Sequence, residues 1–146
     1  IPLPNPSSTP WKYRGGVAVG KTCYFAPYNA DDIGIFEIET LGFRSVDIAS
    51  AISTHTKFSD AVEQNGVVYF VPFNADSVGA FNIATEHFQM LDISKSISRD
   101  FKYWGAVEDK GLTYFVPDNA DNIGVLHAAS KSFVTIDISK QISTDF

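Results

Sequence analysis

Residues 69–76 read Tyr-Phe-Val-Pro-Phe-Asn-Ala-Asp, and closely similar stretches occupy residues 24–31 and 114–121. In each stretch a Tyr-Phe pair is followed by proline and then by Asn-Ala-Asp, and successive stretches begin 45 residues apart. Outward from these stretches, an opening lysine, a glycine and an Asp-Ile pair recur at the same interval. Repetition at a period of this size is the signature of a repeat architecture.

The chain of 146 residues therefore divides into a Pro-rich N-terminal arm, residues 1–11, and a single repeat domain, residues 12–146. The repeats are residues 12–56, 57–101 and 102–146, aligned without an insertion. The arm has no leader of charged and then apolar residues, and the chain begins with Ile rather than Met. These features favour a processed protein that is secreted or imported into an organelle.

Each repeat is expected to form four short strands. In the first repeat the expected strands are 16–19, 22–26, 34–38 and 43–48. The Tyr-Phe run is nearly continuously apolar, which is typical of a buried strand, and proline is expected to end it. Asn-Ala-Asp then forms a turn, because Asn and Asp bond their own backbone and tolerate a left-handed conformation. No segment shows a sustained helical period, so an all-β fold is predicted.

Four strands in a unit of this length match the blade of a β-propeller. The third repeat carries the runs Lys-Tyr-Trp-Gly-Ala-Val at 102–107, Gly-Leu-Thr-Tyr-Phe-Val-Pro at 111–117 and Asn-Ala-Asp-Asn-Ile-Gly-Val-Leu at 119–126. This pattern resembles the blades of YVTN/kelch-like propellers, in particular the long repeat proteins of algae and protists. The resemblance covers residues 12–146, implies tandem antiparallel blades and carries little information about activity.

Three blades are too few to close a propeller, since known propellers have about four or more. Two chains could complete a six-bladed ring, or the three blades could be part of a longer ring. Three units could instead close three-fold as a β-trefoil or β-prism. An open array would leave apolar faces in water, so a homodimer or larger assembly is expected if the fold is a propeller.

Charge and composition exclude several classes of function. The net charge is −6, and the 11 Lys and Arg residues are scattered, so a nucleic-acid-binding face is not expected. The apolar runs are short, which argues against membrane insertion. The single cysteine, Cys23, excludes an internal disulfide.

The sequence offers no catalytic constellation. The three histidines, His55, His87 and His127, occupy unrelated repeat positions, and no His or Cys spacing fits zinc. No phosphate-binding loop, nucleophile elbow or dinucleotide fingerprint occurs. We therefore expect a protein that is not an enzyme and that needs neither cofactor nor metal.

The Asn-Ala-Asp turns are the most prominent polar feature. They are interpreted first as hairpin turns and second as a loop face of amides and carboxylates. Such oxygens suit calcium, but no turn has the ligand density of a calcium loop, so no metal site is assigned. The position before each turn changes from aromatic to acid, and Trp104 replaces Arg14 and Ser59 at its repeat position. The candidate binding residues on this loop face are Asn29, Asp31, Asp32, Asn74, Asp76, Asn119, Asp121, Asn122, Tyr28, Phe73, Asp118 and Trp104.

These observations favour a non-catalytic binding or assembly module. It would act as an accessory or scaffold subunit that contacts a protein partner, or a second copy of itself, through repeat loops and edges. The alternative is a multivalent lectin, because three near-equal sites would bind a glycan through avidity. A propeller hydrolase is the less favoured reading, since fold alone does not exclude it.

Overall fold

The protein is all-β in a computed structural model that describes residues 9–142. Within these residues, twelve strands form three separate four-stranded antiparallel sheets, one for each repeat. The strands are β1 (Tyr13–Val19), β2 (Thr22–Pro27), β3 (Asp32–Glu37), β4 (Gly42–Asp47), β5 (Phe58–Gln64), β6 (Val67–Pro72), β7 (Ser77–Asn82), β8 (His87–Asp92), β9 (Tyr103–Asp109), β10 (Leu112–Pro117), β11 (Asn122–His127) and β12 (Ser132–Asp137). The predicted architecture of three tandem four-stranded antiparallel repeats is confirmed. Residues 1–8 of the predicted arm lie outside the described residues.

Local sequence accounts for the strand ends. Pro27 and its counterparts are the last residues of β2, β6 and β10. Between β5 and β6 the backbone turns at Asn65 and Gly66, which have φ of 51° and 80°. Two successive positive φ angles match the twist of a hairpin, and Asn-Gly adopts them readily.

The first strand of each repeat begins earlier than the sequence predicts. In the first repeat it starts at Tyr13 rather than Gly16, because a shift in register between these residues lets the strand continue. Gly15 lies within this irregularity with φ of 64°. A glycine in the left-handed region is the usual means of inserting one extra residue into a strand.

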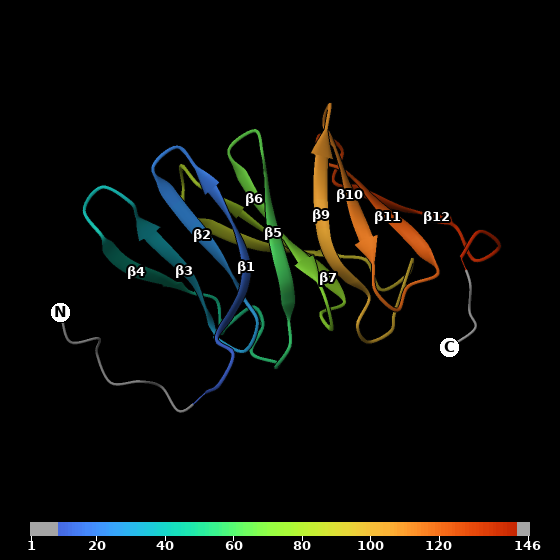
Figure 1. Cartoon of the computed structure of the whole chain (residues 1–146), viewed down its shortest axis with the longest axis horizontal. Coiled ribbons are helices and arrows are strands. Elements are labelled where there is room, and N and C mark those ends of the chain that lie inside the picture. The colour runs from blue at the N-terminus through green and yellow to red at the C-terminus, as the bar shows by residue number, and fades with distance from the viewer. Residues whose placement is uncertain (1–8, 143–146) are drawn as a thin grey trace.

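The sheets stack face to face in chain order. Strands β1, β5 and β9 lie side by side at the front of Figure 1, and the remaining strands of each sheet recede behind them. β1 and β2 pack on β5, and β5 and β6 pack on β9. Each repeat thus forms its own sheet, and consecutive sheets stack as blades do. This arrangement differs from a β-trefoil or β-prism, because those folds close three units on one another.

Two apolar cores hold the stack together. The leading face of a sheet, as used below, is the face toward the preceding sheet, and the trailing face is the face toward the following sheet. Phe58, Phe70 and Phe81 on the leading face of the middle sheet are fully buried against the first sheet. Val71 and Val78 on its trailing face are fully buried against the third sheet. Among residues 9–142 there is no helix long and apolar enough to cross a membrane.

Candidate functional site

The candidate site lies at one end of the stack, where β1, β5 and β9 begin and β2, β6 and β10 end. We call this the loop end. The residue before each opening lysine, Trp11, Thr56 or Phe101, has φ of 51°, 55° or 54°. This left-handed residue turns the chain from the connector into the innermost strand, so the connectors and the Asn-Ala-Asp turns meet at the same end.

Three aromatic rings surround one guanidinium group at the loop end. The Cζ atom of Arg14 lies 4.0 Å from the ring centroid of Trp104, 5.0 Å from that of Tyr28 and 5.7 Å from that of Phe73. Cations within about 6 Å of a ring centroid are attracted by the ring quadrupole. We call these four residues the Arg14 cluster. It joins β1 of the first repeat to β9 of the third.

A small residue in the middle sheet allows this contact. Ser59 occupies the repeat position of Arg14 and Trp104, and its hydroxyl donates a buried hydrogen bond of 2.8 Å to the backbone oxygen of Tyr103. The Arg14 and Trp104 side chains therefore reach one another past β5. Trp104 also packs edge-on against Phe73, with the ring centroids 5.9 Å apart.

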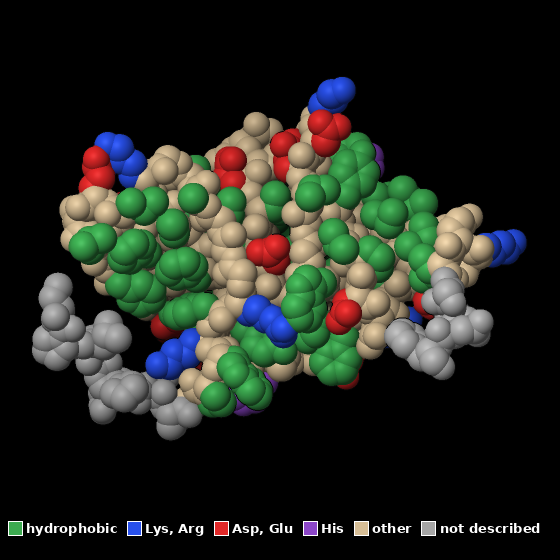
Figure 2. Space-filling model, in the orientation of Figure 1, with side chains coloured by type: hydrophobic (Ala, Val, Ile, Leu, Met, Phe, Trp, Pro, Cys, Tyr) green, Lys and Arg blue, Asp and Glu red, His purple; other side chains and the backbone are tan. Residues whose placement is uncertain are grey.

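An open pocket of about 360 Å³ adjoins the cluster and is lined by Trp11, Tyr13, Arg14 and Tyr28. Trp11 is 76% exposed and Trp104 is 48% exposed. Hydrophobic and basic side chains lie together at the lower centre of Figure 2. The Arg14 guanidinium donates no hydrogen bond to any residue from 9 to 142, so within this part of the chain its N–H groups are available to a ligand.

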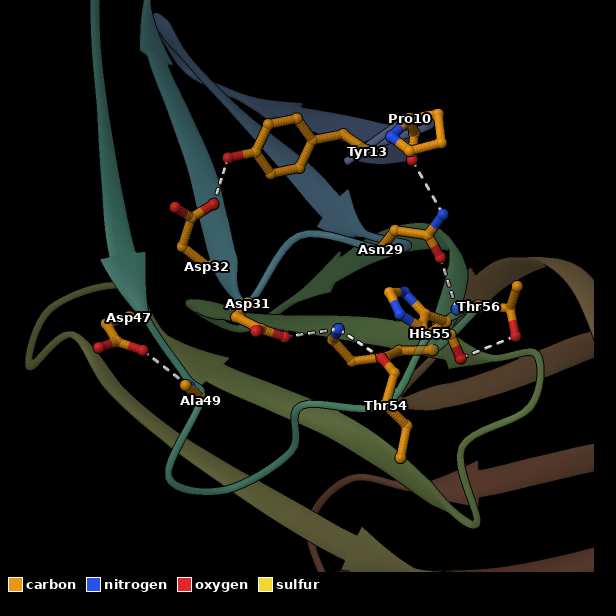
Figure 3. A network of polar contacts seen from close by, with 11 residues as sticks. Pro10, Tyr13, Asn29, Asp31, Asp32, Asp47, Ala49, Thr54, His55 and Thr56 are labelled. Atoms are coloured by element: carbon orange, nitrogen blue, oxygen red, sulfur yellow. Dashed lines mark hydrogen bonds and ion pairs between the residues drawn. The ribbon is translucent and has the colours of Figure 1, made fainter. Parts of the chain in front are cut away.

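The first Asn-Ala-Asp turn holds the next repeat in place (Figure 3). The Lys57 ammonium is fully buried and lies 3.0 Å from Oδ1 of Asp31 and 2.6 Å from the backbone oxygen of Thr54. The Asn29 side chain accepts a hydrogen bond of 2.8 Å from the Thr56 backbone N–H. We call this arrangement, in which the opening lysine of one repeat enters the turn of the preceding repeat, the lysine clamp.

The second turn forms the same clamp. Lys102 is also fully buried, and its ammonium lies 3.0 Å from Oδ1 of Asp76 and 2.9 Å from the backbone oxygen of Ala75. Asn74 accepts a hydrogen bond of 2.9 Å from the Phe101 backbone N–H. Four of the predicted binding residues, Asn29, Asp31, Asn74 and Asp76, therefore make contacts within the protein.

Two further candidates accept hydrogen bonds from tyrosine hydroxyl groups, one half-buried (Tyr13) and one fully buried (Tyr103). The Tyr103 hydroxyl donates a hydrogen bond of 2.6 Å to Asn122, and the Tyr13 hydroxyl donates one to Asp32. Burial, aided by the neighbouring Asp32 carboxylate, raises the pKa of Tyr13 far above its usual range. Burial alone does the same for the pKa of Tyr103.

The third turn differs from the first two. Asp118, Asn119 and Asp121 are exposed, and Asp121 is paired only loosely with Arg99, at 3.4 Å. Of the predicted loop-face residues, the structure brings together Tyr28, Phe73 and Trp104. Sequence reasoning missed Arg14, although Arg14 shares a repeat position with Trp104.

Metal-binding geometry is absent from residues 9–142, where no three His, Cys, Asp or Glu side chains lie close enough to share an ion. His55 and His87 are exposed and lie outside the Arg14 cluster. The chemistry that this end of the molecule offers is aromatic stacking together with hydrogen bonds from one guanidinium group.

Comparison with known proteins supports the fold but identifies no family for the chain. No protein-family model matches the chain, and no curated protein matches it either. Among solved structures, the chain is similar to a streptogramin B lyase, with a TM-score of 0.72 and 17% identity over 90% of this chain and 42% of that one. It is also similar to virginiamycin B lyase from Staphylococcus aureus, with a TM-score of 0.71 and 14% identity over 89% of this chain and 42% of that one.

A third similar structure is the extracellular domain of a putative one-component system from B. thetaiotaomicron, with a TM-score of 0.65 and 11% identity over 83% of this chain and 17% of that one. The chain therefore spans less than half the length of these three proteins. Such low identities establish the fold alone. Together with the three stacked sheets, they identify the repeats as blades of a partial β-propeller.

Proposed function

We propose that the chain is a non-catalytic binding module, of the YVTN/kelch-like propeller type, that contacts a protein partner through its loop end. The observation that carries the proposal is the Arg14 cluster. Trp, Tyr and Arg dominate the energetic hot spots of protein interfaces. Here these three residue types meet at one solvent-facing site, although their positions span 90 residues of sequence.

The cluster is suited to a protein surface. Its rings already fix the guanidinium group, so binding costs little side-chain entropy. About half of the Trp104 surface still faces solvent, and the Arg14 donors can reach a carboxylate or backbone carbonyl of a partner. The expected ligand is a protein segment that offers an acidic or carbonyl acceptor beside an apolar side chain.

A photo-reactive residue in place of Trp104 tests this proposal. We expect one partner to cross-link from position 104 in a native extract, and to be lost when Arg14→Ala is added. The same photo-reactive residue in place of His87, which is exposed on the outermost strand β8, is the matched control. Equal cross-linking from both positions, or cross-linking unchanged by Arg14→Ala, would overturn the proposal.

A glycan is the second candidate ligand, favoured by the open pocket beside Trp11 and Tyr28. Two aromatic faces at a pocket of this size can stack on a sugar ring. Glycan-array binding that is lost in Trp11→Ala and kept in His87→Ala would support this candidate. One glycan per chain is the expected stoichiometry, because the three turns have different neighbours.

The proposal that the chain is not an enzyme is supported by the composition of the loop end, where no described histidine or cysteine lines the pocket. Turnover of ester or lactone substrates that disappears in Arg14→Ala would contradict it. We also propose a location outside the cytoplasm, which the extracellular domain among the similar structures supports. Localising the tagged full-length protein in its native cell tests that part.

A further inference from the structure

A relay of backbone hydrogen bonds runs through the three repeats beside the lysine clamps. The N–H of Lys57 donates to the Tyr28 oxygen, and the N–H of Phe73 donates to the Lys57 oxygen, each over 2.9 Å. Lys102 and Asp118 continue the relay in the third repeat with the same spacing of 2.9 Å. Each repeat therefore presents acceptors to the repeat that follows it and donors to the repeat that precedes it.

The first repeat presents donors that no residue from 9 to 142 accepts. Neither the Trp11 nor the Lys12 backbone N–H has an acceptor in this range, and no carboxylate within it pairs with the Lys12 ammonium. Lys12 is half-exposed, whereas Lys57 and Lys102 are fully buried. These three donors correspond to the groups that form the two complete clamps.

The third repeat presents the matching acceptors. The backbone oxygen of Asp118 and the Asn119 side chain accept no hydrogen bond from residues 9–142, and Oδ1 of Asp121 has no cation beside it in this range. Arg99 binds the other oxygen, Oδ2, from the surface. One end of the stack thus carries the positive half of a clamp, and the other end carries the negative half.

The apolar faces at the two ends are complementary in the same way. On the leading face of the first sheet, Phe43 is 51% exposed and Phe25 and Phe36 are half-buried, although their counterparts Phe70 and Phe81 are fully buried. Cys23 lies on this face and is half-buried for the same reason.

On the trailing face of the third sheet, Val107 is 59% exposed, and Val116 and Ile136 also face solvent. Val71, the counterpart of Val116, is fully buried. Hydrophobic side chains accordingly cover much of the sheet formed by β1 to β4 and of the sheet formed by β9 to β12 in Figure 2.

We propose that two copies of this chain close a six-bladed ring head to tail. In this ring Lys12 of each copy enters the Asn119–Asp121 turn of the other, and the leading face of the first sheet covers the trailing face of the third. Typical propellers have four to eight blades. Six is the only multiple of three in that range, so a ring built from this chain alone takes two copies.

The partner that covers the two blade faces is a second copy of this chain, because the donors and apolar face at one end of the stack match the acceptors and apolar face at the other end. An unrelated protein would have to reproduce a lysine, two backbone donors and an aromatic face in blade geometry, and the chain itself already has all of these. Head-to-tail contacts close into a ring when the rotation per unit permits it. This inference concerns the blade faces and stands independently of partner binding at the Arg14 cluster.

Sedimentation equilibrium and native mass spectrometry of the purified chain test the ring. We expect a species of twice the 16.0 kDa chain mass. Asp121→Ala should raise the dimer dissociation constant about tenfold or more, because it leaves the Lys12 ammonium of the other copy buried at the interface without a carboxylate beside it. Lys21→Met, at an exposed hairpin lysine that pairs with Glu39, should leave the dissociation constant unchanged.

A mixing experiment distinguishes head-to-tail pairing from symmetric pairing of like faces. Phe43→Glu alters only the leading face of the first sheet, and Ile136→Glu alters only the trailing face of the third. Each variant alone should be monomeric, and circular dichroism should show that it keeps its strands. An equimolar mixture should regain a dimer, because one unaltered leading face can meet one unaltered trailing face.

The other outcomes overturn the proposal. If the wild-type chain is monomeric at all concentrations, the two blade faces are covered by repeats or partners outside this chain and not by a second copy. Species larger than a dimer indicate an open head-to-tail array. A dimer that is lost in Phe43→Glu and kept in Ile136→Glu indicates pairing of like faces.

Arg14→Ala separates this test from the test of the proposed function. A chain with this substitution should still form the dimer, because the substitution should remove only partner binding at the loop end.

Discussion

The ammonium of Lys57 lies 3.0 Å from the carboxylate of Asp31, although the lysine opens the second repeat and the aspartate belongs to the turn of the first. The pair is asymmetric, because the lysine side chain is fully buried whereas the aspartate side chain is 50% exposed. The consequence of a substitution therefore depends on which partner is removed. Without the aspartate the remaining lysine is buried, whereas without the lysine the remaining aspartate is half-exposed to water.

Asp31→Ala should destabilise the protein more than Lys57→Met does. Removing the carboxylate leaves a buried ammonium whose one remaining partner among residues 9–142 is the Thr54 oxygen, which we expect to lower the free energy of unfolding by about 2 kcal/mol. Removing the ammonium leaves an aspartate that water can solvate and replaces the lysine with an apolar chain of similar length, so a loss of about 1 kcal/mol or less is expected.

Urea unfolding of both single variants and the double variant measures this difference. Lys21→Met, which breaks a pair that is exposed on both sides, should change the free energy of unfolding by about 0.5 kcal/mol or less. Equal losses from Asp31→Ala and Lys57→Met would show that burial of the lysine does not govern the clamp.

Gly15→Ala should be more destabilising than Gly20→Ala. Both glycines have a positive φ, 64° and 60°, so both substitutions carry a backbone strain of roughly 1 kcal/mol. A Cβ atom at Gly15 would also lie 2.7 Å from Cα of Asp60, whereas one at Gly20 would meet no atom within 4 Å. The difference between the melting temperatures of the two variants measures the effect of the close approach of β1 to β5. Equal melting temperatures would contradict this explanation.

Gln64 and Thr113 form a polar pair in the core between the second and third sheets. The Thr113 hydroxyl donates a hydrogen bond of 3.1 Å to the Gln64 side-chain oxygen, and the Gln64 side-chain nitrogen is buried without a partner among residues 9–142. The equivalent pair between the first and second sheets is Val19 and Val68, which is apolar.

Thr113→Val alone should lower the free energy of unfolding by about 1–3 kcal/mol, since it leaves the whole Gln64 amide unpaired in the core. Adding Gln64→Val copies the apolar pair and should restore the stability to the wild-type level or above it. Thermal unfolding of the three variants reports the result, and a double variant no more stable than Thr113→Val would refute the interpretation.

The protein should lose stability above about pH 10, the ordinary pKa of tyrosine. The pKa values of Tyr13 and Tyr103 are raised in the folded state, chiefly by burial, so these phenols stay protonated when those of the unfolded chain ionise. The unfolded state then binds fewer protons than the folded state, and the free energy of unfolding falls with rising pH. Below that pH the contribution is fully present.

Tyr103→Phe should make this alkaline loss shallower. Phe58 occupies the same repeat position in the middle sheet and is fully buried there, so phenylalanine fits the site. Urea unfolding as a function of pH, together with ultraviolet titration of tyrosinate, measures the effect. A pH profile identical to that of the wild-type protein would contradict the assignment.

Much of the fold was predictable from local sequence. The four strands of each repeat, the strand that ends at each proline and the Asn-Gly hairpin all depend on residues close together in the chain. The start of the first strand was misplaced at Gly16, because the irregularity at Gly15 depends on the approach of the neighbouring sheet. Outside the loop end, nothing in the sequence indicated that Gln64 and Thr113 would form a hydrogen bond.

The candidate site was predicted only in part. Tyr28, Phe73 and Trp104 were recognised as the asymmetric positions of the loop face, and the structure brings them together. The turn residues Asn29 and Asp31 were considered as ligand groups, whereas the structure engages them in clamps to the next repeat. Nothing in the composition of a turn tells whether its oxygens face solvent or an ammonium from another repeat.

By itself the sequence determined the period, the strands and the turns, because backbone preferences and hydrophobic alternation act over a few residues. Tertiary structure alone decided that Arg14 would stack on Trp104 and that Lys57 would be buried against Asp31. Those contacts form only when stacked sheets bring distant positions within a few ångströms and exclude water between them. Among residues 9–142, the same stacking leaves an unpaired Lys12 at one end of the array and, at the other, the Asn119–Asp121 turn, which no lysine of this range enters.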